Sequence, residues 1–511
     1  MSEYRDRMKN GKIHLAILFL ISLLLSLYLF FQTHVLSLDG AFQYIPIAKD
    51  FVSGLYGKAF GHNQQPLYSI FVALLSQGVA DYEQAGRLVS TVFGILLVLP
   101  VYFLGRRVVD DRVAFISTLL LAIHPYVRRF SADVLKESTY LFFLSLAMWF
   151  SWRTIQGEKR SPYLLIPLLS TFAYLARPDG VEVFLVVFFY LFFIKKFHGP
   201  KERWIAILLL LVSSVLLFLP YLIYLRETTG IWTLSRAKTI TSFLGLSVLA
   251  GEISWIERLL FTLKKLNFEI FSIYHPLYIL LLGIGLWKRR ASLFREGEGF
   301  LLLFCAFHYL VLFLLILNLT EWDQGETIRV VQFSGRHVLP ILLFSIHWVG
   351  EGLVALYRWI SNKIESNRLL PRWELKRKSM ILLAILFILV VAIILPKTLK
   401  PQRHERLPEK WAGIWIKNQS GKGVTIFTTL PRVAFYAEGV CEYIDFNKDK
   451  IDKVKSLMTE KGVLYLTIRE REHYSFPEVR ESLKKDFTEL SRFEGKGMER
   501  VIVYRRGSEI P

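Results

Sequence analysis

The chain has 511 residues, of which 53% are hydrophobic, and it contains 40 Phe, 23 Tyr and 12 Trp. This composition excludes an ordinary soluble protein and indicates a polytopic α-helical membrane protein. The formal net charge is +20, but the basic residues lie between apolar stretches and form no continuous basic face, which argues against a nucleic-acid partner. Cys305 lies in an apolar run and Cys441 near the C-terminus, so no disulfide framework is available.

Apolar stretches long enough to cross a bilayer, about 20 residues each, recur along most of the chain. The first lacks a small-residue cleavage site and is interpreted as an uncleaved span. Residues 66–78 are too short to cross and predict an amphipathic surface helix in the first outer loop. About eleven transmembrane helices are predicted, at 13–31, 86–104, 113–127, 134–152, 162–176, 180–194, 204–225, 273–287, 299–317, 336–356 and 380–396.

Lysine and arginine in the short loops predict the orientation. Basic residues precede the first span and occupy every second loop, from Arg106 and Arg107 to residues 358–378, which places those loops in the cytoplasm. We therefore expect an integral plasma (inner) membrane protein with a cytoplasmic N-terminus. The periplasmic side receives everything after about residue 397 and the loops 32–85, 128–133, 177–179, 226–272 and 318–335.

An acidic residue stands directly after the first span, in the sequence Leu38-Asp39-Gly40. A single carboxylate in a solvated loop is common, and solvation is the competing interpretation. A carboxylate at a membrane boundary is also typical of functional sites, because burial in the membrane is costly. Asp39 is therefore the leading catalytic candidate.

A second pair of carboxylates, Asp133 and Glu137, opens the fourth predicted span. Their spacing places both on one face of a helix, with Lys136 beside them. A favourable interaction with the helix dipole accounts for Asp133 without any function. Glu137 lies a turn deeper, which predicts a charged partner or a water-filled cavity.

Arginines also lie on the predicted outer side, where the topology rule disfavours them. Arg129 and Arg177 lie in very short loops and Arg336 opens the tenth span, although Pro178-Asp179-Gly180 is typical of a plain turn and Arg336 could snorkel. Guanidinium groups at such places suggest an anionic ligand. The sequence has no Walker-type loop and no glycine fingerprint, so a lipid-linked phosphate donor fits better than a nucleotide.

The chemistry of glycosyl transfer suits these residue types. A carboxylate that accepts the proton of a sugar hydroxyl contributes about two to four orders of magnitude in rate. The leaving phosphate needs charge stabilisation, for which the candidates are Arg129, Arg177 and Arg336, with Lys136 as a further one. A divalent cation could substitute, bound by oxygens of Asp39, Asp133 and Glu137, but no spacing diagnostic of a metal site is present.

Several short motifs follow one another in an informative order. They are Asp39-Gly40, Gln65-Pro66-Leu67-Tyr68, the stretch 85–90, Leu104 to Arg107, His124-Pro125 and the stretch 131–138, followed by Ser334 to Pro340 and Pro431 to Tyr436. This order resembles GT-C membrane glycosyltransferases. The nearest group is the protein-mannosyltransferase, aminoarabinose-transferase and Rgt-like family (glycosyltransferase family 39 type). The similarity covers roughly residues 10–355, with a weaker match beyond.

The resemblance implies transfer of a sugar from a polyprenyl-phosphate donor to a lipid, glycan or protein acceptor on the outer side, with inversion at the anomeric carbon. Protein glycosylation or lipopolysaccharide modification would be the result. It implies that Asp39 is the general base. Several relatives carry two adjacent acidic residues there, so Asp133 and Glu137 remain alternative catalytic groups. Residues expected to bind acceptor or sugar are His62, Gln65, Tyr68 and His337.

The sequence changes character after residue 396, from apolar runs to alternation typical of a soluble domain. It predicts a transmembrane module at 1–396 and a small extracytoplasmic α/β domain at 397–511. The domain could bind the acceptor, cover the site, or merely stabilise the protein. Helices are predicted at 411–418, 451–460 and 479–485, a helix start at 433–436, and strands at 424–428, 463–467, 489–493 and 501–504.

Two other functions are compatible with many spans and outer charges. A transporter or flippase of lipid-linked saccharides is one, but the sequence shows no internal repeat and no paired broken helices. An O-antigen ligase or polymerase-like enzyme is the other, and its usual large outer loop lies late in the chain. The acidic loop here comes after the first span, which favours the transferase interpretation.

Overall fold

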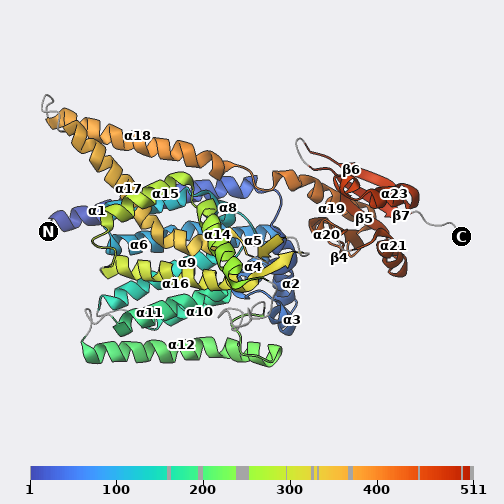
Figure 1. Ribbon diagram of the computed structural model, residues 1–511, viewed down its shortest axis with the longest axis horizontal. Helices are drawn as coiled ribbons and strands as arrows, with labels where there is room; N and C mark the ends of the chain where they lie inside the picture. Colours follow the sequence, from blue (N-terminus) through green and yellow to red (C-terminus); the bar gives the residue numbers. More distant parts are fainter. Residues whose placement is uncertain are drawn as a thin grey trace. The chain divides into compact units, whose positions relative to one another are not determined.

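The protein consists of two compact units in the computed structural model (Figure 1). The first comprises Met1–Phe30 and Ile47–Lys400, and the second comprises Phe31–Pro46 and Pro401–Pro511. The structure describes residues 2–157, 163–193, 199–236, 253–294, 296–323, 327–330, 333–365, 372–446, 449–495 and 499–506.

The first unit is a bundle of α-helices that confirms the predicted polytopic class (Figure 1). Within the described residues six stretches are long and apolar enough to cross a membrane: Gly11–Gln32, Tyr82–Val108, Lys201–Thr229, Gly297–Leu319, Gly335–Lys363 and Ala384–Ser420. A seventh is counted if α14 (Trp255–Ile273) and α15 (Pro276–Arg289), which meet at 101°, form one broken span.

The helices of the bundle follow the predicted apolar stretches closely. The predicted surface helix is α4 (Leu67–Ser76). The remaining helices are α1 (Ser2–Gln32), α2 (Ile45–Val52), α3 (Tyr56–Gly61), α5 (Tyr82–Leu96), α6 (Val98–Val108), α7 (Asp111–Ala122), α8 (Pro125–Ser131), α9 (Glu137–Ile155), α10 (Leu165–Ala176), α11 (Val181–Phe193), α12 (Pro200–Thr229), α16 (Glu296–Leu319), α17 (Leu339–Glu365) and α18 (Arg372–Leu399). Short connecting elements are the 3-10 helices η2 (Pro178–Gly180) and η3 (Gly335–Val338) and the hairpin β1 (Thr320–Asp323) with β2 (Thr327–Val330).

Helix α14 lies, except for its last residue, within the segment 226–272 that was predicted as an outer loop. Ser254 caps its N-terminus and forms a capping box with Glu257, a local signal that fixes where the helix begins. The helix is amphipathic, so its sequence lacks the uniformly apolar stretch that predicts a span.

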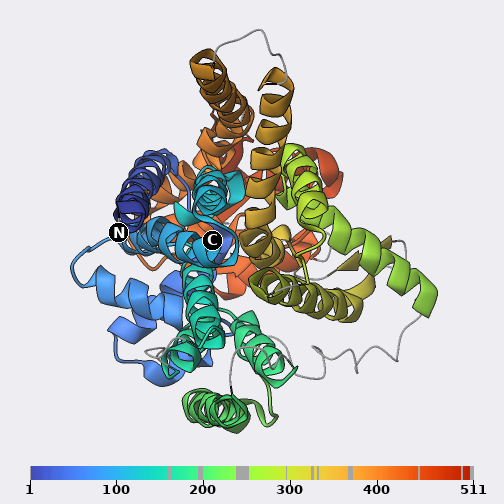
Figure 2. The same ribbon diagram turned by 90° about the vertical axis from the view of Figure 1, so that its left-hand side faces the viewer.

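Helix α9 forms the centre of the bundle and packs against α5, α6, α10 and α11. Its inward side chains Leu144, Met148 and Trp152 are buried. By contrast α12, the green helix at the edge of the bundle in Figure 2, packs on α10 and α11 and leaves apolar residues such as Leu216 exposed. Exposed apolar residues on a spanning helix are what contact with lipid requires.

Helices α15 and α17 approach each other closely. A Cβ atom at Gly285 would collide with the carbonyl of Trp348, and one at Gly352 would collide with the carbonyl of Leu281. Small residues at a helix crossing allow this separation, as is usual for helices packed within a membrane. The close packing fixes the position of α17, which directly follows the 3-10 helix η3.

The second unit is built on a five-stranded mixed sheet with the order β4-β3-β5-β7-β6. Strands β3 (Thr425–Thr428), β4 (Val440–Tyr443) and β5 (Tyr465–Arg469) are parallel, whereas β6 (Phe487–Phe493) and β7 (Val501–Arg506) pair antiparallel. Its helices are η4 (His404–Arg406), α19 (Leu407–Ser420), α20 (Pro431–Tyr436), α21 (Ile451–Glu460), α22 (Glu472–Ser475) and α23 (Pro477–Asp486).

Alternate residues of these strands face two separate cores. Ile426 packs with α19 and α20 on one side, and the next residue, Phe427, packs with α21 and α23 on the other. The predicted small α/β domain is therefore confirmed. The sequence did not predict β4, an edge strand whose residues are exposed or partly buried and lack the alternation of a half-buried strand.

Residues 31–46 belong to the second unit, where the C-terminal part of the chain holds their backbone. Arg432 Nε donates a hydrogen bond to Leu36 O at 3.0 Å, and Leu36 N donates to the Tyr436 hydroxyl at 3.0 Å. Lys410 Nζ donates to His34 O at 2.8 Å. The segment ends in the short π-helix η1 (Gly40–Tyr44).

Candidate functional site

The side chain of Glu137 is a buried charge without hydrogen bonds among the described residues. Glu137 begins α9, is 1% exposed, and neither carboxylate oxygen makes a hydrogen bond. Its Oε1 lies 3.8 Å from Nη1 of Arg177 and 3.7 Å from Nη1 of Arg336. These separations exceed hydrogen-bonding distance, so the carboxylate faces two guanidinium groups without closing on either.

Arg177 comes from the turn between α10 and α11. The residue before a proline favours extended backbone, and Arg177 has φ −150° and ψ 140°, which directs the chain into η2. Gly180 completes the turn because a Cβ there would collide with the backbone of Ala173 and Tyr174. The buried guanidinium donates to Asp179 Oδ2 at 2.8 Å and lies 5.2 Å from the ring centre of Tyr140.

Arg336 and His337 lie in η3, just before α17. The carbonyl oxygen of Arg336 accepts a hydrogen bond from Arg177 at 3.4 Å, which links η3 to the Arg177 turn. The Arg336 side chain is 30% exposed, in contrast to the buried Arg177 and Glu137. Arg336 is therefore the charged group of this cluster that a ligand can reach.

A buried histidine extends the cluster. His308 of α16 contacts Glu182 Oε2 of α11 through Nδ1 at 2.6 Å, and its Nε2 donates to His337 O at 2.8 Å. His337 in turn contacts Ser334 O through Nδ1 at 2.9 Å. The pair thus connects α11, α16 and η3, and it fixes the backbone on which Arg336 stands.

Glu182 and His308 were not among the predicted site residues. Both stand inside apolar stretches, and ionisable residues within spans are rare unless they pair or function. Each taken alone is a weak signal. Their pairing depends on α11 and α16 lying side by side, which the sequence does not state.

Two predicted sugar-binding residues have structural partners. The buried hydroxyl of Tyr68 donates to Gly86 O at 2.8 Å and lies 2.9 Å from Ser90 Oγ. Gln65 accepts from the Tyr221 hydroxyl at 2.8 Å and donates to Leu234 O at 3.1 Å. These hydrogen bonds give both residues a structural role within the bundle. Their sugar-binding roles stay predictions.

The motif around Ser90 packs on the Asp133 turn. Ser90 Oγ donates to Leu135 O at 2.8 Å, and a Cβ at Gly86 would come within 2.8 Å of Val134. Asp133 is fully buried and accepts from Val134 N at 2.7 Å through Oδ1. Two motifs separated in sequence thus build one corner of the bundle, which positions the start of α9.

The other two predicted phosphate ligands, Lys136 and Arg129, have contacts elsewhere in the bundle. Lys136 Nζ donates to Gln64 Oε1 at 2.7 Å and is 9% exposed. Arg129 is half-buried in α8. Its neighbour Arg128 is fully buried and donates to Ser22 Oγ at 2.7 Å.

His62 pairs with Asp50, an acidic residue on α2 that the sequence analysis did not single out. His62 Nε2 lies 2.9 Å from Asp50 Oδ2, and Lys58 Nζ lies 2.9 Å from Oδ1. Burial acts to raise the pKa of Asp50, but the hydrogen bonds and charges of Lys58 and His62 outweigh it and lower the pKa. This arrangement orders the helices α2 and α3.

Asp39 stands at the start of η1 in the second unit and is half-buried. Gly40 N donates to Ser37 Oγ at 3.0 Å, which closes the turn that carries the aspartate. Within the described residues no group of three or more His, Cys, Asp or Glu side chains converges as a metal site would require. A cation bound by Asp39, Asp133 and Glu137 thus stays a prediction without a converging ligand set.

Comparison with known proteins agrees with the motifs. Residues 63–249 match the family described as dolichyl-phosphate-mannose-protein mannosyltransferase. A comparison with curated protein sequences gave no significant match.

Solved structures extend the agreement to most of the chain. ArnT from Cupriavidus metallidurans bound to undecaprenyl phosphate is 11% identical, with a TM-score of 0.58 over 96% of this chain and 97% of that one. The oligosaccharyltransferase AglB from Archaeoglobus fulgidus, in complex with an inhibitory peptide and a dolichol-phosphate, is 13% identical, with a TM-score of 0.55 over 99% and 75%. An Archaeoglobus fulgidus oligosaccharyltransferase complex with zinc and sulfate is 12% identical, with a TM-score of 0.50 over 93% and 71%. These matches confirm the predicted resemblance, and the chain has the fold of the GT-C membrane glycosyltransferases.

Proposed function

We propose that this protein is a membrane glycosyltransferase that moves a sugar from a polyprenyl-phosphate donor to an acceptor hydroxyl. The reaction would take place on the periplasmic side of the inner membrane, with inversion at the anomeric carbon. The family match at residues 63–249 supports the class of reaction. The similarity to ArnT, whose structure holds undecaprenyl phosphate, supports the class of donor.

The observation that carries the proposal is the open contact between Glu137 and two arginines. Both guanidinium groups face the Glu137 carboxylate at 3.7–3.8 Å, and neither forms a hydrogen bond with it. A phosphate oxygen can therefore form the short charge-assisted bonds that the carboxylate does not. Arg336 would bind the phosphate, because its side chain is partly exposed. The buried Arg177 would add positive charge beside it.

Glu137 and Asp179 would act on the arginines and not on the sugar. Asp179 holds the Arg177 guanidinium at 2.8 Å, and Glu137 offers a second negative centre between the two arginines. Fixed carboxylates of this kind orient guanidinium groups before the substrate binds, which lowers the reorganisation needed in the transition state. Glu137 is thus a positioning residue in this proposal.

The chemistry is a single displacement. The acceptor oxygen forms a bond to the anomeric carbon as the bond from that carbon to the phosphate oxygen breaks, and the products are a glycoside and polyprenyl phosphate. The acceptor proton passes to a carboxylate, for which Asp39 is proposed. The phosphate leaves as an anion and needs the arginines but no proton.

The test uses the purified full chain in proteoliposomes with a radiolabelled polyprenyl-phosphate sugar. We expect Asp39→Asn to lower sugar transfer by about two to four orders of magnitude, because the base is lost, while donor binding stays unchanged. The matched control is Asp452→Asn, which removes an 84% exposed carboxylate of the same unit.

Three outcomes would revise the proposal. Wild-type turnover in Asp39→Asn would move the base to Asp133 or Glu137. Equal losses in both variants would point to folding. An absence of turnover by the wild-type protein with every such donor, together with movement of the intact donor across the membrane, would replace the enzyme by a flippase.

A further inference from the structure

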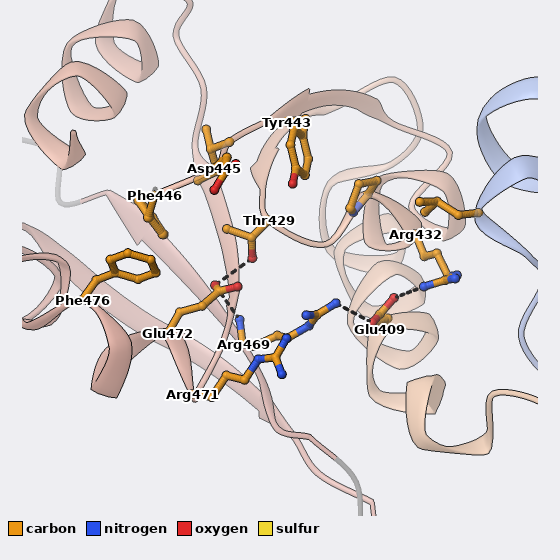
Figure 3. Close-up of a pocket in the computed structure, with 13 residues that line it drawn as sticks. Glu409, Thr429, Arg432, Tyr443, Asp445, Phe446, Arg469, Arg471, Glu472 and Phe476 are labelled. Atoms are coloured by element: carbon orange, nitrogen blue, oxygen red, sulfur yellow. Dashed lines mark hydrogen bonds and ion pairs between the residues drawn. The ribbon is translucent and has the colours of Figure 1, made fainter. Parts of the chain in front are cut away.

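A pocket of about 390 Å³ opens in the second unit (Figure 3). It lies at the carboxyl ends of the three parallel strands, where Thr429 follows β3, Asp445 and Phe446 follow β4, and Glu472 follows β5. In the sheet β3 has β4 on one side and β5 on the other. Connections therefore leave the centre in opposite directions here, which is where open α/β sheets bind ligands.

The floor of the pocket is polar and fixed. Glu472 Oε2 accepts from the Thr429 hydroxyl at 2.8 Å and from Arg469 N at 3.1 Å. Both bonds use the same oxygen, so Oε1 has no protein partner among the described residues. Burial raises the pKa of this carboxyl, which favours exchange of hydrogen bonds with a hydroxyl over pairing with a cation.

Charge in the pocket is balanced. Three acidic and three basic side chains line it: Glu409, Asp445, Glu472, Arg432, Arg469 and Arg471. The arginines already have carboxylate partners, because Arg432 lies 3.1 Å from Glu409, and Arg469 and Arg471 lie 3.1 and 2.9 Å from Glu499. A phosphate would have to displace these pairs, whereas a neutral polyhydroxyl ligand can use the remaining donors and acceptors of the same groups.

Aromatic rings complete the lining. Phe446 and Phe476 lie together on one side of the pocket, with ring centres 5.8 Å apart, and Glu409 and Arg432 lie on the opposite side (Figure 3). Tyr443 also lines the pocket and is 61% exposed. Aromatic faces beside planar polar groups suit a sugar ring, which presents apolar C–H faces and a polar hydroxyl edge.

The predicted base lies next to one wall of the pocket. Leu38 lines the pocket, and Asp39 is the following residue. Arg432, itself a lining residue, donates to Leu36 O, and Tyr436 accepts from Leu36 N, so the wall is held from α20 at two points. The motif Pro431 to Tyr436 therefore connects the pocket to the loop that carries the aspartate.

We propose that this pocket binds a saccharide as the acceptor and places a hydroxyl of that sugar beside Asp39. The inference rests on the proposed transferase function and adds the chemical class of the acceptor. The second unit is then an acceptor-binding domain.

Binding is tested on the purified full chain by ligand-observed NMR without donor. The probes are methyl glycosides of glucose, galactose, mannose and N-acetylglucosamine, with glucose 1-phosphate for comparison. We expect at least one methyl glycoside to bind, and Tyr443→Ala to weaken that binding about tenfold. The control is Tyr474→Ala, which removes a 72% exposed tyrosine outside the pocket.

The second measurement separates this inference from the proposed function. Tyr443→Ala should raise the KM for a saccharide acceptor about tenfold, while the control Tyr474→Ala keeps both the wild-type KM and the wild-type rate of slow sugar release from the donor into water. Binding of glucose 1-phosphate alone, no binding of any glycoside, or equal binding by both tyrosine variants would overturn the saccharide pocket. If the wild-type protein does not turn over the donor, the transferase function is contradicted, but the result on saccharide binding is unaffected.

Discussion

Two glutamates in the same bundle are equally buried and differently paired. Glu137 and Glu351 are each 1% exposed. Glu351 accepts a hydrogen bond from Arg289 Nη2 at 2.9 Å, and Arg289 also binds Glu298 at 3.2 Å. Glu137 has two arginines at 3.7–3.8 Å and no hydrogen bond.

Under the proposed function, the difference separates a structural ion pair from a site that binds a ligand. Arg336 and Glu351 are about 20 Å apart along η3 and α17, at roughly 1.5 Å per residue of helix, so the two clusters occupy distant levels of the bundle. A buried carboxylate is costly unless it is hydrogen-bonded. The protein meets that requirement at Glu351 and leaves it unmet at Glu137, whose two neighbouring arginines would bind the donor phosphate under the proposed function.

The largest effect on stability is expected for Glu351→Gln. The substitution removes the charge that faces Arg289, and breaking such a pair should cost about 2–3 kcal/mol, less than for a fully buried pair because Arg289 is partly exposed. Heat inactivation should become faster, while the transfer rate of the remaining folded protein should stay near the wild-type value. Arg358→Gln is the control, since its half-exposed guanidinium lies 3.8 Å from Glu351. If the folded Glu351→Gln protein also transferred sugar more slowly, the distinction between a structural cluster at Glu351 and a ligand site at Glu137 would be wrong.

Arg336→Ala should chiefly weaken donor binding. Loss of a charge-assisted hydrogen bond to the phosphate corresponds to about 2 kcal/mol, or roughly a thirtyfold higher Kd for the polyprenyl-phosphate sugar. Arg336→Lys should have a donor Kd between those of the wild-type protein and Arg336→Ala, because lysine keeps the charge but not the planar guanidinium group. Stability should change little in either variant. An unchanged Kd would transfer the role of phosphate ligand to Arg129 or Lys136.

Glu137→Gln makes the sharpest comparison, because it is the same substitution as at Glu351. We expect the protein to be no less stable, since the carboxylate makes no hydrogen bond that glutamine would lose. Transfer should fall about tenfold, or about 1.4 kcal/mol, because two guanidinium groups lose the charge that orients them. The measurement compares the unfolding rates and the single-turnover transfer rates of Glu137→Gln and Glu351→Gln. A loss of stability as large as that of Glu351→Gln would class Glu137 as structural.

Much of the fold was predictable because it follows from local patterns. Long apolar stretches directly indicate helices that lie in lipid. In the second unit, the helix predicted at 451–460 is found as α21 (Ile451–Glu460). The misses have local causes as well. Helix α14 is amphipathic and β4 is a short edge strand, so neither gives the signal of a span or of a half-buried strand.

The candidate site was predictable only in part. Arg177, Arg336 and Glu137 were recognisable as charges at the ends of spans, and the structure brings these three together. Tyr68 and Gln65 were equally plausible from their motif, yet both have hydrogen-bond partners within the bundle. A motif records that a residue matters and does not distinguish a contact with substrate from a contact with a neighbouring helix.

The sequence by itself determined that the protein is a polytopic membrane protein with a small α/β domain and a GT-C arrangement of motifs. Hydrophobic runs, loop charges and motif order are properties of neighbouring residues, so they are legible without coordinates. Tertiary structure alone decided that Glu182 pairs with His308 and that the segment before Asp39 is held by Arg432 and Tyr436. These contacts join residues more than a hundred positions apart, and which side chains meet over such separations depends on how the elements pack.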